Sequence, residues 1–347
     1  MTTEDSTASG TPLVSVVVPC YNGAEYVRHA VRSALDQTYS NIEVLIIDDG
    51  STDDSRSILE TTFGDRTTIV TTPNGGPSAA RNVGLKMANG EYVQFLDADN
   101  VLTPGKIARS VEAFAAEPDT DIVFSAIHEP RDYDFTDATA FAEQELAQTV
   151  ERMLERAYEL VFPGTGMLAL ETSQPLFRRD TLLRHGGWDE TLTVVEDTEL
   201  VCRLAMHGAQ IRHIPMVGVI YRNHPGDRVT NRMRFDNEAY FRSVLKMIKV
   251  ARECGWMNGA VQTFSMQYLV WIAGLECVRQ GKRDHARRYL AVAREISPTL
   301  PGPLPFRAAV KVFGPLGALS IAGVLVNLAL KIAPRRTRAA FGIPEPD

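Results

Sequence analysis

The segment over residues 92–100 constrains the fold more than any other part of the chain. It reads Tyr-Val-Gln-Phe-Leu-Asp-Ala-Asp-Asn, an apolar run typical of a buried strand that ends in two carboxylates. Because successive side chains of a strand point to opposite faces, Asp97 and Asp99 share a face while the backbone stays extended. They then form one anionic site at the carboxyl end of a strand, where open α/β sheets bind their ligands. Carboxylate oxygens suit Mg²⁺ or Mn²⁺, so the segment predicts a metal site, although such a motif taken alone also fits a solvated turn.

Strand and helix patterns alternate over residues 13–125. An apolar run at 13–18 and a second segment at 44–49, apolar until it ends in two aspartates, predict buried strands, and apolar residues at helical spacing between them predict a helix. Pro77 follows a glycine-containing loop and is well placed to begin another helix. Alternation of this kind is typical of a parallel sheet flanked by helices.

Composition and charge limit the classes of partner. A net charge of −7 leaves no basic excess to neutralise phosphates, so we expect no nucleic-acid partner. The four cysteines stand far apart without a C-x-x-C pair, and we expect them to remain reduced thiols. Residues 1–11 are polar, lack the basic and apolar parts of a signal peptide, and predict a disordered lead-in. These features favour a cytoplasmic location.

The length of 347 residues predicts two units, or one domain with a substantial extension. We expect a main domain over residues 12–232, with 12–125 as one half and 126–232 as the other. The second half begins with a long excursion of the kind that forms substrate lids, and the chain rejoins the sheet near 174–179. Residues 233–347 show mainly helical periodicity and predict a helical C-terminal region.

Residues 312–330 carry no charge and are bounded by Lys311 and Lys331. As a helix, this segment is just long enough to cross a bilayer. Its glycines, proline and asparagine, with basic residues at both ends, fit a helix on a membrane surface or one packed in protein equally well. A contact with the inner face of the cell membrane is therefore one of three interpretations that stay open.

Six short segments form one pattern along the chain. They are Val-Ser-Val-Val-Val-Pro-Cys-Tyr-Asn at 14–22, Asp-Asp-Gly-Ser-Thr-Asp at 48–53, Gly-Pro-Ser-Ala-Ala-Arg-Asn at 76–82, Phe-Leu-Asp-Ala-Asp at 95–99, Gly-Trp-Asp at 187–189 and Glu-Asp at 196–197. Together they resemble glycosyltransferase family 2 over residues 13–225. The resemblance implies an α/β fold of the GT-A (Rossmann-like) type, with a mostly parallel sheet flanked by helices and here a C-terminal helical extension. The family's usual D-x-D-D reads Asp97-Ala98-Asp99-Asn100, where an amide replaces the last carboxylate; this should leave the metal site intact.

The resemblance assigns nucleotide-sugar binding to the half over residues 12–125. In the family, a ring at the end of the first strand packs against the base, an acidic residue accepts a hydrogen bond from uracil, and a cation faces the nucleotide. From the residues alone, core packing for Tyr21 and a helix-surface charge for Arg81 stay open. The residues matched to nucleotide-binding positions are Pro19 and Tyr21, Asp49, Arg81, and Asp97 with Ala98.

The resemblance also assigns the metal and the acceptor side. Asp97 and Asp99 match the metal ligands, and His224 matches a position that adds a ligand or touches the phosphates. Asp197 matches the general base that takes the proton of the acceptor hydroxyl. A structural role for His224 and a helix N-terminal charge for Asp197 are the alternatives. The remaining acceptor-side residues are Asp189, Glu196 and Trp188, the last as an apolar platform under a sugar ring or else as a core residue.

These assignments imply an inverting glycosyltransferase with Mn²⁺ or Mg²⁺ as cofactor. It would move a hexosyl or N-acetylhexosaminyl group from a nucleotide diphosphate sugar, with a UDP-sugar favoured, to a glycan, lipid-linked or other hydroxyl acceptor in polysaccharide, cell-envelope or glycolipid synthesis. Two alternatives are a catalytically silent glycan- or nucleotide-binding protein of the same fold and a related nucleotidyl enzyme. A nucleotidyl enzyme carries a glycine-rich loop with Arg and Lys after the first strand, and a dehydrogenase carries G-x-G-x-x-G there; residues 19–23 have neither.

Overall fold

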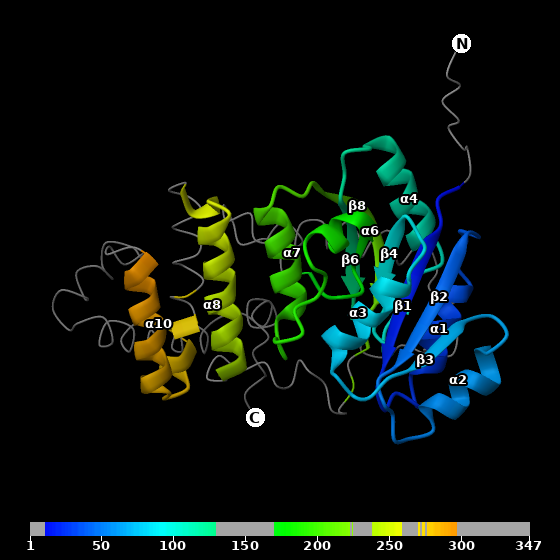
Figure 1. The fold of residues 1–347 in the computed structure, drawn as a ribbon, viewed down its shortest axis with the longest axis horizontal. Coiled ribbons are helices and arrows are strands. Elements are labelled where there is room, and N and C mark those ends of the chain that lie inside the picture. Colours follow the sequence, from blue (N-terminus) through cyan, green and yellow to red (C-terminus); the bar gives the residue numbers. More distant parts are fainter. Residues whose placement is uncertain are drawn as a thin grey trace, which may run out of the picture. The chain divides into compact units, whose positions relative to one another are not determined.

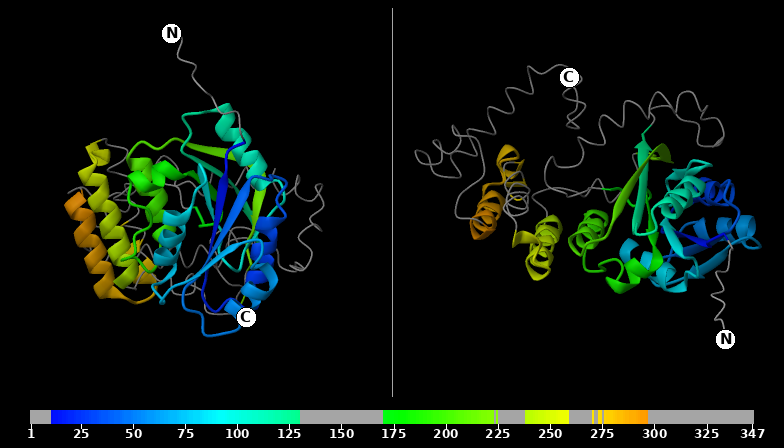
Figure 2. Two further views of the ribbon diagram at one scale, coloured as in Figure 1. Left: turned by 45° about the vertical axis from the view of Figure 1, so that its right-hand side comes forward. Right: turned by 90° about the horizontal axis from the view of Figure 1, so that it is seen from above.

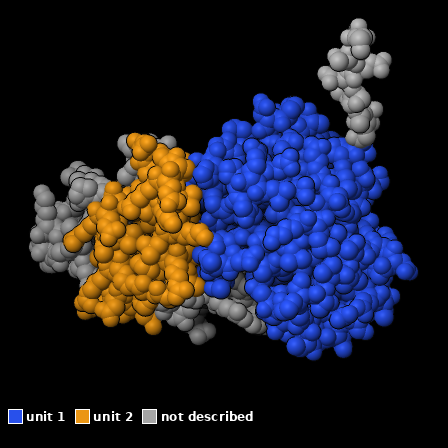
Figure 3. Space-filling model, in the orientation of Figure 1, with its two compact units in different colours: residues 1–163, 167–228 blue, residues 164–166, 229–347 orange. Residues whose placement is uncertain are grey.

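The structure, a computed structural model, describes residues 11–129, 170–222, 224, 238–258, 270, 273–274 and 276–296. The chain divides into two compact units, residues 1–163 with 167–228 and residues 164–166 with 229–347 (Figure 3). Among the described residues, no helix is both long and apolar enough to span a membrane. Four predictions lie outside the described residues: the lead-in up to residue 10, the excursion over 130–169, the boundary at 232 and the segment 312–330.

Within the described residues of the first unit, eight strands form one sheet in the order β3-β2-β1-β4-β7-β6-β8-β5 (Figure 1). Parallel pairs join β1 to β2 and β4, and β2 to β3, as the alternating pattern predicted for the first half. Strand β6 is also parallel to β8, which lies in the second half. By contrast, β7 runs antiparallel to β4 and β6, and β5 runs antiparallel to β8. The strands are β1 (Val14–Cys20), β2 (Ile42–Asp48), β3 (Thr68–Thr71), β4 (Tyr92–Phe95), β5 (Val101–Leu102), β6 (Ile122–His128), β7 (Pro175–Arg178) and β8 (Ile211–Ile220).

Helices cover both faces of this sheet (Figure 2). Val16 and Val18 of β1 pack with α1, α2 and α4, whereas Val17 packs with α3, α6 and α7 on the other face, because side chains alternate along a strand. All three valines are buried, as expected of parallel strands covered on both sides. The helices are α1 (Val27–Leu35), α2 (Ser55–Phe63), α3 (Pro77–Met87), α4 (Lys106–Ala116), α6 (Arg179–Arg184) and α7 (Glu196–Met206).

Helix α3 packs closely on β1 because Gly84 has no side chain. A Cβ at Gly84 would lie 2.3 Å from Cγ1 of Val17, a separation that real Cβ contacts do not show. Pro77 is the first residue of this helix, as predicted. The close approach holds the N-terminal turns of α3, which carry Arg81, against the sheet.

The second unit is helical where it is described. It contains α8 (Glu238–Glu253), the 3-10 turn η2 (Trp256–Asn258) and α10 (Arg283–Ile296). The apolar stripes of α8 and α10 meet through Phe241 and Tyr289, whose ring centroids are 4.9 Å apart. Gly281 precedes α10 with a φ of 75°, a backbone conformation that glycine adopts readily at a turn.

Candidate active site

The loops that follow β1, β2 and β4 meet at one edge of the sheet. These strands are parallel neighbours, so their carboxyl ends lie side by side. The backbone N–H of Asp49 donates to the carbonyl of Cys20 at 2.8 Å, which joins the loops after β2 and β1. A Cβ on Gly23 would lie 3.5 Å from Cβ of Ala98, which places the loop after β1 against the turn at residues 97–100. Three separate segments of the sequence therefore form one site.

The residues matched to the nucleoside lie at this edge. Tyr21 is 52% exposed, so its ring is open to solvent rather than packed in the core. The Asp49 side chain is only 3% exposed, and its two carboxylate oxygens accept the backbone N–H groups of Gly75 and Gly76, both at 2.8 Å. Asp49 thus anchors the glycine loop that leads into α3, and its contact with a base stays a prediction. Pro19 is half-buried at the end of β1.

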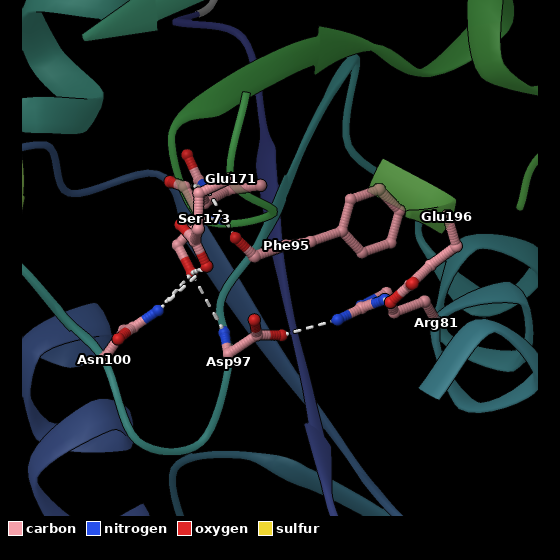
Figure 4. Close-up of polar contacts among 8 residues, drawn as sticks. Arg81, Phe95, Asp97, Asn100, Glu171, Ser173 and Glu196 are labelled. Atoms are coloured by element: carbon pink, nitrogen blue, oxygen red, sulfur yellow. Dashed lines mark hydrogen bonds and ion pairs between the residues drawn. The ribbon is translucent and has the colours of Figure 1, made fainter. Parts of the chain in front are cut away.

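Arg81 joins the two sides of the site (Figure 4). This residue of α3 is 4% exposed. Its Nη2 atom donates to Asp97 Oδ1 at 2.8 Å, and its Nη1 atom donates to Glu196 Oε1 at 3.1 Å. Burial opposes the charge of Arg81, yet the carboxylates of Asp97 and Glu196 raise its pKa above the usual value. Arg81 therefore remains a cation that bridges the end of β4 to the start of α7.

Two of the three predicted metal ligands lie together. Nε2 of His224 is 3.2 Å from Oδ2 of Asp99, and the His224 ring packs on Tyr26 with centroids 4.5 Å apart. The carboxylate of Asp97 instead contacts Arg81. In the part of the chain that the structure describes, no three His, Cys, Asp or Glu side chains are grouped closely enough to hold a metal unaided. A carboxylate and an imidazole nevertheless suit Mn²⁺, which would complete its shell with ligand and water oxygens.

Asp197 lies in the first turn of α7, beside the Arg81 bridge. Burial, with the neighbouring charge of Glu196, raises the pKa of Asp197 to about 7, and the charges of Arg81 and Asp97 also act on it. Its Oδ1 atom accepts the backbone N–H of Thr198 at 2.6 Å. A carboxyl group that changes charge near neutral pH can act as a general base.

The turn before α7 contains strained backbone that the sequence did not indicate. Val195 has a φ of 63°, in the left-handed region that β-branched residues rarely adopt. Such strain persists where the surrounding structure holds it, often at functional sites. Here it lies immediately before Glu196 and Asp197, so the strained residue sets the direction in which α7 begins.

The residues expected to contact the sugar acceptor are less exposed to solvent than expected. Trp188 is 3% exposed, and its ring lies against the Arg81 guanidinium at 4.5 Å and edge-on to Phe95 at 5.0 Å. The structure therefore supports the core interpretation of Trp188 over the platform. Asp189 Oδ1 accepts the backbone N–H and the hydroxyl of Thr191, at 3.0 and 2.7 Å, which closes a local turn. An acceptor role for Asp189 stays a prediction.

Two residues of the site were not anticipated. Oγ of Ser173 accepts the backbone N–H of Asp97 at 3.2 Å and the Nδ2 group of Asn100 at 3.1 Å. Glu171 Oε1 accepts Nδ2 of Asn100 at 3.0 Å. Burial and the charge of Asp97 raise the pKa of Glu171 above its ordinary value. Because the segment 170–174 reaches β4 only through the tertiary fold, no local sequence pattern marks it.

The sequence matches a protein-family model described as glycosyl transferase family 2, over residues 15–173. An uncharacterised glycosyltransferase of Rickettsia prowazekii is 39% identical over 112 residues, which are 32% of this chain and 35% of the relative. The match thus spans about a third of that relative's length.

Two solved structures have a similar fold. A mannosyltransferase from Pyrobaculum calidifontis, in complex with GDP-Man and Mn²⁺, has a TM-score of 0.54 at 22% identity, covering 92% of this chain and 88% of that chain. The S. aureus protein TarS, in complex with UDP-GlcNAc, has a TM-score of 0.53 at 18% identity, covering 82% and 92%. At these identities the likeness concerns the fold, which is the GT-A fold.

Proposed function

Because residues 15–173 match the glycosyltransferase family 2 model and the described residues have the GT-A fold, we propose that this chain transfers a sugar, with inversion, from a nucleotide diphosphate sugar to an acceptor hydroxyl. The donor we propose is a UDP-sugar, and the transferred group is a hexose or an N-acetylhexosamine. UDP-GlcNAc in one structural neighbour and GDP-Man with Mn²⁺ in the other support a nucleotide-sugar donor. The choice of uracil rests on the family resemblance, in which Asp49, just after β2, matches a residue that accepts a hydrogen bond from uracil.

The observation that carries this proposal is the Arg81 bridge. One buried guanidinium contacts Asp97, in the D-x-D turn, and Glu196, next to Asp197. A site for glycosyl transfer needs a diphosphate-binding end and a base within the length of a sugar ring. The bridge supports such an arrangement because it links the turn after β4 directly to the first turn of α7.

The residues present can divide the chemistry between the two ends. Asp99 and His224 would hold a divalent cation, which stabilises the negative charge that develops on the departing diphosphate. Asp197, when deprotonated, accepts the proton of the acceptor hydroxyl as the oxygen attacks the anomeric carbon from the opposite face. Arg81 keeps Asp97 and Glu196 fixed, which keeps the two ends at a constant spacing.

We place the reaction in polysaccharide, cell-envelope or glycolipid synthesis, on the cytoplasmic side of the cell membrane. The support for this location is the uncharged segment 312–330 between basic residues, together with four cysteines that are thiols in the structure. A glycan or a lipid-linked hydroxyl is the acceptor class that fits such a location.

Calorimetric titration of the full chain with UDP tests the proposed function. We expect UDP to bind more tightly with Mn²⁺ than with EDTA, and more tightly than GDP. A panel of nucleotide sugars should then contain one donor that raises the melting temperature in the presence of Mn²⁺, because a ligand that binds only the folded state stabilises it. Absence of binding by UDP and GDP alike, with and without Mn²⁺, would contradict the proposal.

The rate of transfer should depend on pH through Asp197. Burial and the charge of Glu196 raise the pKa of this carboxyl to about 7, and the base must be deprotonated to act. We therefore expect kcat/KM to fall about tenfold per pH unit below pH 7 and to level off above it. A profile that stays flat down to pH 5 would contradict the assignment of Asp197 as the base.

A further inference from the structure

Asn100 is the amide that replaces a carboxylate in the D-x-D-D pattern, and both its nitrogen and its oxygen form hydrogen bonds. It is 1% exposed. Its Nδ2 group donates to Glu171 Oε1 at 3.0 Å and to Ser173 Oγ at 3.1 Å, and its Oδ1 atom accepts the backbone N–H of Arg222 at 3.3 Å. The side chain therefore connects the turn after β4 to two other segments, one before β7 and one after β8.

Glu171 needs donors around it, and Asn100 is one of them. The other carboxylate oxygen, Oε2, accepts the backbone N–H of Ser173 at 2.9 Å. The hydroxyl of Ser173 also donates to Glu171 Oε1, at 3.4 Å, so Glu171 is the acceptor in each of these contacts (Figure 4). A buried acceptor that loses its hydrogen-bond donor destabilises the folded state, because it has given up its bonds to water without a replacement. An aspartate at position 100 would replace that donor by a further carboxylate beside Glu171, whose pKa is already raised by burial and by the charge of Asp97, so these buried acidic groups would repel one another or have to take up a proton.

The segment that contains Glu171 is also hydrogen-bonded to strand β4. Lys106, fully buried at the start of α4, donates from Nζ to Gln94 Oε1. Nε2 of Gln94 donates to the backbone carbonyl of Ser173 at 2.8 Å. Because strand β4 and helix α4 both brace this segment, Glu171 cannot move away from a changed residue 100 without disturbing the core.

We propose that Asn100 and Glu171 are a matched pair of positioning residues, which fix the D-x-D turn so that Asp99 faces His224 and a divalent cation with the donor diphosphate. This inference rests on the proposed function. The amide at position 100 is then a requirement of Glu171 in this chain, and the pair acts through Asp99 rather than by touching the donor. The chain exchanges the usual last carboxylate of the pattern for a carboxylate on a different segment.

Exchanging the amide and the carboxylate between positions 100 and 171 tests the pair. Asn100→Asp should weaken UDP binding in Mn²⁺ about tenfold to a hundredfold, because Glu171 then loses the Asn100 donor and gains a further carboxylate beside it in a buried site. Its UDP affinity in EDTA should change little. Asn100→Ala should be milder than Asn100→Asp, because it removes the donor without adding a charge. The double variant Asn100→Asp/Glu171→Gln restores one donor and one acceptor, and should bind UDP with Mn²⁺ to within about threefold of wild type.

A matched control lies at the opposite end of the strands. Nδ2 of Asn89 donates to Glu43 Oε2 at 3.2 Å, next to the start of β2. Asn89→Asp therefore also places a carboxylate beside a glutamate, at an exposed position away from the site, and should leave the gain in UDP affinity that Mn²⁺ provides unchanged.

The outcomes separate this inference from the proposed function. If wild type binds UDP but Asn100→Asp binds it equally well, or the double variant is no better than Asn100→Asp, the pairing is overturned and the proposed function stands. If wild type does not bind UDP, the proposed function fails first. Where Asn100→Asp does not fold, recovery of soluble, UDP-binding protein in the double variant supports the pair, and failure of that recovery overturns it.

Discussion

Replacing Asp197 by asparagine should lower kcat of transfer by about a hundredfold to ten-thousandfold, the usual contribution of a positioned general base. The affinity for UDP with Mn²⁺ should stay within about twofold of wild type, because Asp197 lies on the acceptor side of the Arg81 bridge. Transfer is measured with the donor identified in the stabilisation panel and an accepted hydroxyl compound. Equal rates for the variant and wild type would remove the proposed mechanism.

Asp180→Asn is a matched control, because Asp180 also lies in the first turn of a helix, α6, and is exposed. It should leave the rate of transfer unchanged.

The stability of Asp197→Asn provides a second control. The pKa of Asp197 is about 7 in the folded state and about 3.8 without its surroundings, so between these values the folded state binds more protons and the free energy of unfolding falls as pH rises. Asparagine does not titrate, so this variant should be at least as stable as wild type at pH 8.

Replacing Arg81 by methionine should lower the free energy of unfolding by about 3–5 kcal/mol, the usual cost of removing one partner from a buried ion pair. Asp97 and Glu196 would each lose their cation in a site where Arg81 itself is 4% exposed. Denaturant unfolding monitored by circular dichroism measures the change.

An exposed ion pair gives the comparison for Arg81. Arg56 Nε lies 2.8 Å from Glu60 Oε1 on the surface of α2. Arg56→Met should lower the free energy of unfolding far less than Arg81→Met does, because solvent screens exposed pairs. Adding Glu196→Gln to Arg81→Met should recover part of the lost stability, since one uncompensated carboxylate is removed. An Arg81→Met cost as small as that of Arg56→Met would show that the bridge does not hold the site together.

The strands of the first half could be predicted from the sequence because each is a short, apolar run whose pattern is local. Residues 13–18 and 44–49 were predicted as buried strands, and β1 and β2 occupy them. The direction of β7 could not be predicted, because Pro175–Arg178 shows the same apolar character in a parallel or an antiparallel pair. Its direction depends on the path of the chain between β6 and β7, which local patterns do not describe.

The candidate site could be predicted in its parts but not in its connections. Asp97, Asp99 and Tyr21 follow strands, so their location at the carboxyl edge of the sheet was implied by the pattern. The partner of Arg81 on the far side, Glu196, is 115 residues away along the chain, and only the tertiary structure brings the two together. The left-handed backbone of Val195 is equally invisible in the sequence, because valine is not a residue that predicts it.

The central claim is that one end of the site binds the donor diphosphate through a cation while the other end supplies the base. The most direct test measures the UDP affinity with Mn²⁺ and the rate of transfer on two variants, Asp99→Ala and Asp197→Asn. We predict that Asp99→Ala loses the gain in UDP affinity that Mn²⁺ provides, whereas Asp197→Asn keeps this gain and loses transfer. If both variants lost UDP affinity to the same extent, or if neither lost transfer, the division of the site into these two ends would be wrong.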